Sequence, residues 1–386
     1  MTFWHQIKNK IGKTRDLVAL GSSDLIGNGI TSILWLYIAS ISHTANYGEL
    51  QLIISIAGTA YLFSLFATPT VMTVYASKNF KLDSTLTFIT LLGTLVSATV
   101  VSLLFSRIDI GFLVLGFVMN DLATSYLIGK KEYSKYTKYV ISQKSISLIL
   151  CILLYQKFGN AGVIYGLTIS YLPFVKIIYA IFKETKINFA EIKSRIGFII
   201  NNYLISLASV FRSQLDKILI GSVFGFSLLG NYALASQIYA IFMILPNILT
   251  KFLLPEEARG KSSKRFKKYT MIIGILISLF GILILPQIIP IAFPAYTDTI
   301  EIIKITSLGI IPATLSLILS TELLGMEKSK HVLIARWIWA GTVIGGIFFL
   351  GQFYGILGLS SALVLSTVFY DIYLLIVKFY TGRKLV

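Results

Sequence analysis

Residues 85–105, TLTFITLLGTLVSATVVSLLF, and residues 108–128, IDIGFLVLGFVMNDLATSYLI, decide the fold class of this chain. Each run has 21 residues, mostly apolar, and only Ser106 and Arg107 separate the two. A helix needs about 20 mostly apolar residues to cross a bilayer, where no water can satisfy an irregular backbone. The two runs therefore predict a pair of membrane-spanning helices joined by a tight turn.

The same pattern recurs along the whole sequence. Further apolar runs of similar length predict spans at 17–41, 50–75, 139–156, 161–182, 198–224, 228–253, 269–292, 302–324, 333–352 and 356–378. The composition agrees, because 55% of the 386 residues are hydrophobic and 13% are charged, whereas a soluble domain is about 25% charged. We therefore predict an all-α integral membrane protein with about twelve transmembrane helices.

The lysines and arginines between the spans indicate the orientation of the helices. They gather at alternate joints and at both termini, in the clusters 8–15, 78–81, 130–138, 183–195, 259–268, 328–336 and 378–384. The remaining joints hold only Arg107 and Lys157. Because cytoplasmic loops collect basic residues, we expect a multi-pass protein of the cytoplasmic (inner) membrane with both termini in the cytoplasm. This asymmetry accounts for most of the net charge of +17, so no nucleic-acid partner is predicted.

Residues 1–14 have a pattern of their own. Phe3, Trp4, Ile7 and Ile11 recur at helical spacing among lysines. Such a pattern is typical of a short amphipathic helix that lies on the inner leaflet and contacts membrane lipids. A disordered basic tail is the alternative for the same residues.

The chain also contains an internal repeat. Three local matches lie 185 to 196 residues apart: Asn46-Tyr47 with Asn231-Tyr232, Pro69 with Pro255, and Phe158-Gly159 and Gly162 with Tyr354-Gly355 and Gly358. The repeat predicts two six-helix bundles, at 1–190 and 191–386, related by a pseudo-two-fold axis along the membrane normal. Transporters built from such repeats bind substrate between the halves. We expect the chain to act as a monomer.

Four ionisable residues lie inside predicted spans of the first half: Asp24, Asp121, Lys144 and Lys176. Counted from the cytoplasmic end of each span, all four lie about 10–13 Å deep. Placing a charged side chain inside a span costs about 2.5–3.5 kcal/mol on insertion scales, so each of these residues is expected to have a structural or functional role. One reading is two buried ion pairs that only neutralise each other. The other is the floor of a hydrated cavity, in which Asp24 or Asp121 binds H⁺ or Na⁺ and the two lysines attract an anion.

The second half places more cations than acids inside its spans. Arg212, Lys217 and Lys304 are candidates for binding a phosphate group, because an arginine fork and fixed cations suit phosphate oxygens. Asp216 and Asp371 are further candidates for ion coupling. A structural alternative pairs Arg212 with Asp216, four residues on along one helix face.

A second structural alternative concerns Lys304, which could extend to the membrane surface beside Glu301. Neither alternative provides a partner for Lys217.

No catalytic or cofactor signature is present. The sequence has one cysteine, Cys151, and three histidines far apart, His5, His43 and His331. It contains no glycine-rich phosphate loop, no metal-spaced His/Cys set and no nucleophile elbow. The predicted outer joints are also too short to hold a catalytic domain. We expect no metal, no cofactor and no enzymatic activity.

The residues around span seven resemble a known family. Arg212-Ser213-Gln214-Leu215-Asp216-Lys217-Ile218-Leu219-Ile220-Gly221, followed by Leu229-Gly230-Asn231-Tyr232-Ala233, is similar to the seventh-to-eighth-helix signature of polysaccharide-biosynthesis flippases of the O-antigen type. Asn46-Tyr47-Gly48 and the two glycine pairs fit the same family, which belongs to the multidrug/oligosaccharidyl-lipid/polysaccharide exporter superfamily.

The resemblance implies a fold and an activity. Two six-helix bundles would form a V around a cationic cavity and move a polyprenyl-(pyro)phosphate-linked oligosaccharide from the inner to the outer leaflet. Such proteins work by alternating access without ATP. This chain departs from the pattern by having lysines in the first half where family members often have arginines, and by lacking two extra C-terminal spans found in some members.

Three other functions fit parts of the sequence. A cation-coupled drug or small-molecule antiporter could use the same fold, but Arg212 and Lys217 would repel cationic drugs. A membrane enzyme of glycan assembly is disfavoured by the short outer joints. An accessory subunit without transport would leave the charges inside the spans unexplained.

Overall fold

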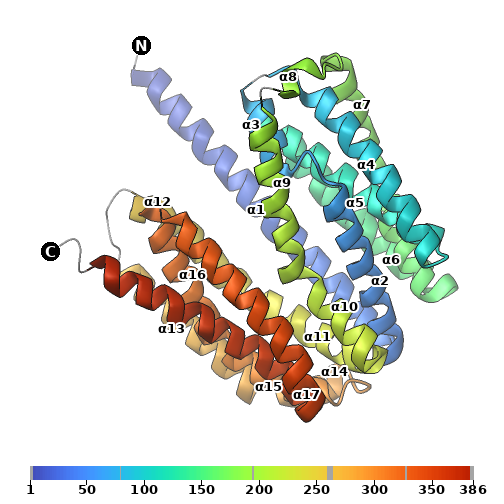
Figure 1. Ribbon diagram of the computed structural model, residues 1–386, viewed down its shortest axis with the longest axis vertical. Coiled ribbons are helices and arrows are strands. Elements are labelled where there is room, and N and C mark those ends of the chain that lie inside the picture. Colours follow the sequence, from blue (N-terminus) through green and yellow to red (C-terminus); the bar gives the residue numbers. More distant parts are fainter. Residues whose placement is uncertain (1–2, 79, 194, 259–263, 327, 383–386) are drawn as a thin grey trace. The chain divides into compact units, whose positions relative to one another are not determined.

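The computed structural model describes residues 3–78, 80–193, 195–258, 264–326 and 328–382; the side chains of 3–20, 208–213, 251–252, 254–256, 258 and 381–382 lie outside the description. Throughout these ranges the regular structure is helical (Figure 1). Within the described residues, eight helices are long and apolar enough to cross a membrane, or nine if the bent pair Thr44–Ser64 and Pro69–Ser77 is one span. The predicted all-helical multi-pass membrane protein is confirmed, and the number of twelve spans stays a prediction.

Contacts within the chain define two compact units. Unit 1 comprises residues 1–38 and 53–215, and unit 2 comprises residues 39–52 and 216–386. These two units are defined by contacts within the chain and not by membrane spans. The six-helix bundles predicted at 1–190 and 191–386 therefore stay a prediction.

Unit 1 contains ten elements wholly or in part: α1 (Phe3–Ile41), α2 (Thr44–Ser64), α3 (Pro69–Ser77), α4 (Asp83–Leu104), α5 (Ile108–Gly129), α6 (Tyr133–Ser170), the 3₁₀ turn η1 (Leu172–Phe174), α7 (Val175–Glu184), α8 (Ala190–Lys193) and α9 (Ile196–Ser213). Helices α4 and α5 pack against each other along their length (Figure 1). The turn predicted at Ser106 and Arg107 lies between them. A Cβ atom at Gly111 would lie 2.9 Å from the carbonyl oxygen of Ala98, so glycine permits this close packing.

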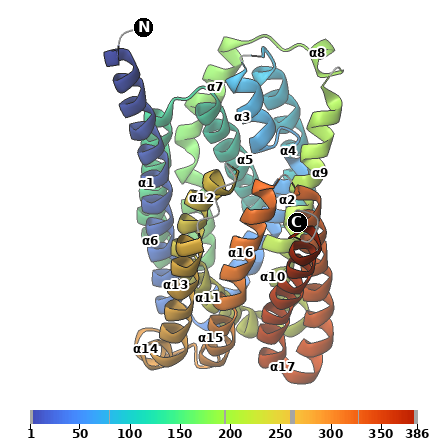
Figure 2. The same cartoon turned by 90° about the vertical axis from the view of Figure 1, so that its left-hand side faces the viewer.

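The N-terminal segment corrects one prediction. Helix α1 runs from Phe3 to Ile41 without a break (Figure 2). The residues from Phe3 onward therefore form no separate helix, and the interfacial location predicted for residues 1–14 stays a prediction. The reason is helix cooperativity, since extending a formed helix costs less than nucleating a second one, and no proline interrupts the segment.

Helix α6 is two helices joined at a glycine. Gly159 has φ 56° and ψ −136° inside this helix, a conformation that side chains other than glycine's rarely allow. The two arms then run side by side, because the Gln143 amide donates to the Ser170 hydroxyl at 2.8 Å. A Cβ atom at Gly162 would lie 2.1 Å from the carbonyl oxygen of Leu154. The joint predicted between spans 139–156 and 161–182 is therefore a glycine-dependent hairpin.

Unit 2 repeats that hairpin in α17 (Ser329–Gly382). Gly355 has φ 55° and ψ −130°, and the Trp339 indole donates to Thr367 across the hairpin at 3.4 Å. A Cβ atom at Gly358 would lie 1.9 Å from the carbonyl oxygen of Leu350. The matched glycine pairs of the sequence repeat thus form the same turn in both units.

The other helices of unit 2 are shorter. They are α10 (Leu215–Phe224), α11 (Phe226–Phe242), α12 (Ile244–Ala258), α13 (Lys264–Leu283), α14 (Leu285–Ala292), α15 (Thr299–Leu308) and α16 (Ile310–Gly325). Figure 2 shows α13, α15 and α16 side by side, and all three are in mutual contact. Leu319, Leu323, Val332, Ala335 and Leu374 form a buried core between α16 and the α17 hairpin.

Candidate functional site

Two acids and one lysine of unit 1 form a polar layer on α1, α5 and α6. The Tyr136 hydroxyl donates to Asp24 Oδ1 at 2.9 Å. Asp121 accepts a hydrogen bond from Tyr61, and its Oδ1 accepts one from the Asn120 amide at 3.0 Å. Both carboxylates are therefore held by neutral donors, as expected for charges buried in a helical bundle.

Lys144 is positioned by close packing of α1 on α6. A Cβ atom at Gly27 of α1 would lie 3.7 Å from Lys144 Cγ, and the Ser23 and Thr137 hydroxyls are 2.6 Å apart in the same contact. The Lys144 ammonium is close enough to interact electrostatically with Asp121. No ion pair between them occurs in the described part of unit 1.

Lys176 does not belong to this layer. It is exposed on α7, and no described contact joins it to Asp24, Asp121 or Lys144. The prediction of a four-residue layer was wrong here because equal depth along a helix does not specify which way a side chain faces.

The helical segment around Arg212 is interrupted. Helix α9 ends at Ser213 and α10 begins at Leu215, so Arg212 and Asp216 do not share one uninterrupted helix face as predicted. The side chain of Arg212 lies outside the described residues. Asp216 instead accepts a hydrogen bond from the Tyr232 hydroxyl at 2.6 Å, from α11.

Lys217 lies in a polar neighbourhood without strong ion pairing. It is half-buried, and its ammonium reaches the Gln51 side-chain oxygen at 3.5 Å. Asp216 acts on it electrostatically, but that carboxylate is already bonded to Tyr232. A half-buried ammonium with one long hydrogen bond retains capacity to bind an anion.

Lys304 has a different environment from the one predicted. It is exposed on α15 and forms an ion pair with Glu301 at 3.2 Å, three residues before it. The structure therefore contains the pairing with Glu301 that the sequence raised as an alternative, and the phosphate-binding role of Lys304 stays a prediction.

Asp371 is a buried acid of α17. The residue is 4% exposed, and its Oδ1 accepts a hydrogen bond from the Ser316 hydroxyl of α16 at 2.5 Å. Its Oδ2 has no hydrogen-bond partner in the described part of the structure. Such a carboxylate can take up a proton or a cation, because either would offset the cost of burying its charge.

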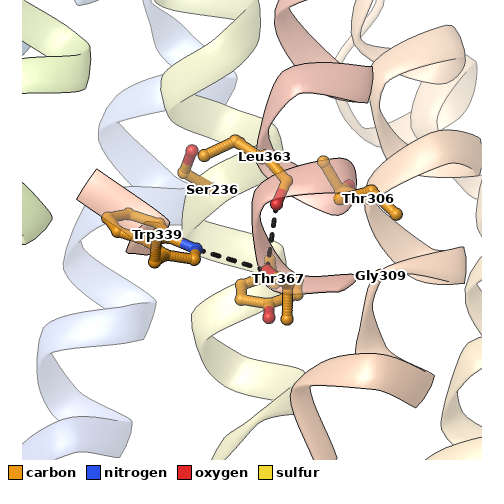
Figure 3. A pocket seen from close by; sticks show the side chains of 8 residues that line it. Ser236, Thr306, Gly309, Trp339, Leu363 and Thr367 are labelled. Atoms are coloured by element: carbon orange, nitrogen blue, oxygen red, sulfur yellow. Dashed lines mark hydrogen bonds between the residues drawn. The ribbon is translucent and has the colours of Figure 1, made fainter. Parts of the chain in front are cut away.

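A neutral pocket lies in unit 2 between α11, α15 and α17 (Figure 3). Its empty volume is about 430 Å³, and the lining residues are Ser236, Tyr239, Thr306, Gly309, Trp339, Leu363, Val364 and Thr367. The Trp339 indole points to the Thr367 hydroxyl, which donates to the Leu363 carbonyl at 2.9 Å. Hydroxyls and an indole, with no charge among these lining residues, suit a neutral hydroxylated group better than a phosphate.

An ion network joins three helix ends in unit 1. Lys130, directly after α5, lies 2.6 Å from Glu184 at the end of α7 and 3.7 Å from Asp83 at the start of α4. Tyr126 donates a second hydrogen bond to Glu184. One lysine thus serves two acids, and this small group is named the Lys130 network.

Unit 2 contains a network of the opposite sign. Glu322 of α16 contacts Lys267 of α13 at 2.5 Å and Lys378 of α17 at 2.5 Å. Lys267 also contacts Glu257 of α12 at 2.9 Å. One glutamate thus lies between two lysines, and we name this group the Glu322 network.

Among the described residues, no group of three or more His, Cys, Asp or Glu side chains could hold a metal ion. The predicted absence of a metal and of a cofactor stays a prediction. Four polar features therefore remain as candidates for function: the Asp24–Asp121–Lys144 layer, Lys217 with Asp216, Asp371, and the neutral pocket.

A comparison with protein families shows which family the sequence of this region resembles. Residues 109–297, which include Asp121, Lys144 and the α9–α11 segment, match the family described as polysaccharide biosynthesis protein.

This match covers 189 of the 386 residues and gives the family that the chain resembles over this stretch. A search of curated proteins found no match. The fold of the chain is similar to that of lipid II flippase MurJ in an inward closed conformation, with a TM-score of 0.76 at 15% identity over 94% of this chain and 87% of the other.

Two other solved structures share the fold. An inward-facing multidrug resistance MATE family transporter of the MOP superfamily gives a TM-score of 0.65 at 14% identity, covering 96% of this chain and 97% of the other. A MOP superfamily transporter from Pyrococcus furiosus gives 0.60 at 14% identity, covering 96% and 95%. The chain therefore has the fold of these MOP superfamily transporters.

Sequence reasoning missed two buried acids of this chain. Asp83 lies two residues before the apolar run 85–105, and Glu322 lies inside the run 302–324. Both are under 7% exposed. A count of every charge within one helical turn of each span would have found them, because a buried charge near a span end requires a partner just as one at mid-span does.

Proposed function

We propose that this protein is a flippase that moves a polyprenyl-(pyro)phosphate-linked oligosaccharide from the cytoplasmic to the outer leaflet by alternating access. The observation that carries the proposal is the family match over residues 109–297 within a MOP transporter fold. The substrate class follows from what polysaccharide biosynthesis must move across a membrane, which is a glycan on a lipid carrier.

The proposed membrane arrangement has twelve spans in two bundles, 1–190 and 191–386. The hairpins at Gly159 and Gly355 support it, because each divides a 52-residue apolar stretch into two spans. The remaining two spans are the bent pair α2–α3 and the broken pair α9–α10. The basic clusters between spans support cytoplasmic termini in the cytoplasmic membrane.

Lys144 and Lys217 are the proposed attractors of the carrier phosphate, with Arg212 as a third. Neither lysine forms a close ion pair in the described residues, and Lys144 is more deeply packed than the exposed Lys176 and Lys304. The neutral pocket around Trp339 would suit sugar hydroxyls rather than phosphate. Phosphate and sugar would therefore meet different chemistry on the way across.

The membrane potential supports the proposed direction. A cell interior is negative, so each anionic charge moved outward gains about 2.3 kcal/mol per 100 mV. Asp121 and Asp371 are the proposed sites where H⁺ or Na⁺ couples to the cycle, with Asp24 and Asp216 as weaker candidates because tyrosine hydroxyls already occupy them. A monomer would be sufficient for this mechanism.

Transfer between leaflets tests the proposal directly. Purified protein is reconstituted into liposomes that carry a fluorescent polyprenyl-pyrophosphate oligosaccharide, and a membrane-impermeant reductant destroys the label on the outer leaflet. We expect protein-dependent loss of the protected inner fraction. A protected fraction equal to that of protein-free liposomes, with folded protein present, would refute flippase activity.

The same assay tests the cationic residues. Lys217→Gln and Lys144→Gln should each lower the transfer rate about tenfold to a hundredfold, because a charge-assisted contact to phosphate contributes roughly 1.5–3 kcal/mol. Lys135→Gln is the matched control, since Lys135 is 64% exposed and pairs with Glu132 on the surface of one helix. Equal rates for all three variants would remove the lysines from the proposed site.

A drug or small-molecule antiporter is the competing outcome. The similarity to multidrug resistance MATE family transporters shows the fold alone. Efflux of a cationic dye driven by a proton or sodium gradient, without glycolipid transfer, would favour it over the flippase.

A further inference from the structure

The neutral pocket of unit 2 lies within the predicted membrane spans. Its lining residues come from α11, α15 and α17, which are in mutual contact. All of them fall inside the predicted spans 228–253, 302–324, 333–352 and 356–378. A polar group at membrane depth is costly unless it forms a hydrogen bond. A pocket with several hydroxyls and an indole at this depth therefore favours a polar ligand over a lipid chain.

Hydrogen bonds hold one wall of the pocket in place. The Trp339 indole donates to the Thr367 hydroxyl at 3.4 Å, and this hydroxyl donates to the Leu363 carbonyl oxygen at 2.9 Å (Figure 3). The two bonds fix the orientation of the indole against the other arm of the α17 hairpin. Because the wall is formed before a ligand arrives, binding costs little conformational entropy.

The other side of the pocket presents hydroxyl oxygens. Thr306 lies across the pocket from Trp339 in Figure 3, and its hydroxyl donates to the Ile302 carbonyl oxygen at 2.8 Å. A hydroxyl has two acceptor lone pairs besides its one proton, so the Thr306 oxygen can also accept a hydrogen bond from a ligand. Ser236 and Tyr239 of α11 add two further hydroxyls to the lining.

A glycine leaves space in the pocket. A Cβ atom at Gly309 would lie 2.9 Å from Val364 Cγ2, so a larger residue there would have to displace Val364. The empty volume of about 430 Å³ lies in the lower part of the range of about 300–1,000 Å³ that small-molecule sites occupy. This volume suits one sugar ring and not a whole oligosaccharide.

The charges around the pocket disfavour an anionic ligand. None of the lining residues is an acid or a base that carries a charge at neutral pH. Asp371 follows Thr367 by four residues in α17, so the two side chains lie on the same face of that helix. An ionised Asp371 would repel a carboxylate or a phosphate in the pocket. The site therefore suits an uncharged ligand with several hydroxyls.

We propose that the neutral pocket binds one uncharged pyranose ring of the transported glycan against the Trp339 indole. The proposal rests on the proposed function for the source of the sugar. The C–H groups of the ring pack on the indole, while its hydroxyls donate to Thr306 and to the hydroxyls of α11. These contacts replace some of the hydrogen bonds to water that a glycan loses at membrane depth. The pocket thus selects neutral sugars, with residues other than the lysines proposed for the carrier phosphate.

Tryptophan fluorescence tests the pocket without any transport. The substitutions Trp4→Phe, Trp35→Phe and Trp337→Phe leave Trp339 as the only tryptophan, and lipid nanodiscs avoid detergents with sugar head groups. The probes are the methyl glycosides of glucose, galactose and mannose. At least one should change the Trp339 emission with a dissociation constant on the order of 1 mM, as expected for a ligand of this size. Methyl glucuronide, which carries a carboxylate, should bind at least about tenfold more weakly.

The same titration contains the outcomes that contradict the sugar site. An emission that none of the three neutral glycosides changes would overturn the proposal, and so would an equal affinity for methyl glucuronide. Farnesol and ethidium represent the competing occupants, an isoprenoid chain and a cationic drug. A response to either of them without a response to a neutral glycoside would also overturn the proposal.

Two tryptophans on one helix provide a matched pair for transport. With a carrier glycan of neutral hexoses, Trp339→Leu should lower glycolipid transfer about tenfold, because the ring loses its aromatic wall. Trp337→Leu should leave transfer unchanged, since Trp337 is 50% exposed and does not line the pocket. Equal transfer rates for these two variants, at equal amounts of folded protein, would overturn the role of Trp339.

Two threonines provide a second pair with a smaller change in volume. Thr306→Val should lower transfer about twofold to tenfold, the effect of one hydrogen bond. Thr342→Val is the control, because Thr342 also donates to a carbonyl of its own helix, that of Ile338 at 2.7 Å, and does not line the pocket. Equal effects of the two substitutions would contradict a ligand contact at Thr306.

Binding and transfer together separate this proposal from the proposed function. Glycoside binding at Trp339 without any glycolipid transfer would refute the flippase and leave the sugar site standing. Glycolipid transfer without glycoside binding, at the same rate in Trp339→Leu and the parent, would overturn the sugar site and leave the flippase standing.

Discussion

The Lys130 network and the Glu322 network occupy corresponding places in the two units with opposite charges. In unit 1, a lysine joins the start of α4 to the ends of α5 and α7. In unit 2, a glutamate joins the start of α13 to the ends of α16 and α17. In both units, ion pairs join the ends of three helices. The position of these ion pairs is the same in the two units, whereas the signs of the charges are reversed.

The two networks differ in how well the central charge is matched. Glu322 has a lysine at 2.5 Å on each side, and Lys267 has the additional partner Glu257. Lys130 serves two acids alone, and Asp83, 1% exposed, is 3.7 Å away. Asp83 also accepts no hydrogen bond in the described part of the structure. The Glu322 network is therefore balanced, whereas the Lys130 network retains one excess negative charge.

Inverting the central charge should have the largest effect. Lys130→Glu would gather three acids, and Glu322→Lys would gather three lysines around one acid. In each variant the free energy of unfolding should fall by about 3–5 kcal/mol, because a buried charge is left without its partner. The yield of folded protein and the midpoint of thermal unfolding in detergent measure this. Lys135→Glu makes the same charge change at an exposed site and should unfold near the parent temperature.

Inverting a whole network should restore much of that loss. The triple variant Asp83→Lys, Lys130→Glu and Glu184→Lys gives unit 1 the charge order of unit 2. We expect it to unfold at a clearly higher temperature than Lys130→Glu alone, because opposite charges again adjoin. A triple variant no more stable than the single one would show that the two networks are not interchangeable.

The two glycine hairpins should respond alike to substitution. Gly159 and Gly355 share nearly equal backbone angles, and a side chain in such a conformation costs about 1–3 kcal/mol. Gly159→Ala and Gly355→Ala should therefore lower the free energy of unfolding of the protein by similar amounts, as measured by unfolding with a chemical denaturant. Gly341→Ala, where a Cβ atom meets nothing within 4 Å, should be neutral or slightly stabilising. A large difference between the two hairpin variants would contradict the equivalence of the turns.

The smallest effects should come from two exposed pairs. Lys135–Glu132 in unit 1 and Lys304–Glu301 in unit 2 are both spaced by three residues and lie at the surface. Lys135→Ala and Lys304→Ala should each change stability by less than about 0.5 kcal/mol, because solvent screens such pairs. Glycolipid transfer by Lys304→Ala should equal that of the parent. A marked loss of transfer would return Lys304 to the phosphate site that its sequence position suggested.

The sequence was sufficient to locate the helices and their joints. The apolar runs at 85–105 and 108–128 became α4 and α5 within a few residues, because burial in lipid requires length and apolarity, and both can be read directly. The repeated glycines also marked both hairpins, although the sequence did not reveal that each takes a positive φ and a carbonyl contact. The separate N-terminal helix failed, because amphipathic spacing alone cannot tell a short helix from the extension of a long one.

The facing of charged side chains was beyond sequence reasoning. Lys144 and Lys176 have similar calculated depths, yet one packs beside α1 and the other is exposed. Lys217 and Lys304 differ in the same way. The depth of a residue in a span can be counted from the sequence. The direction of its side chain relative to the protein depends on which neighbouring helix covers each side of the span.

By itself, the sequence determined that this chain is an all-helical membrane protein with a two-fold repeat, because apolar length and periodic matches are local properties. Only the tertiary structure decided that Asp83 and Glu322 meet their counter-charges, that Gly48 and Gly230 bring two backbones together, and that Asp371 keeps one oxygen without a hydrogen bond among the described residues. These features join residues from 47 to 182 positions apart in the sequence, and residues so far apart come together only when the helices pack.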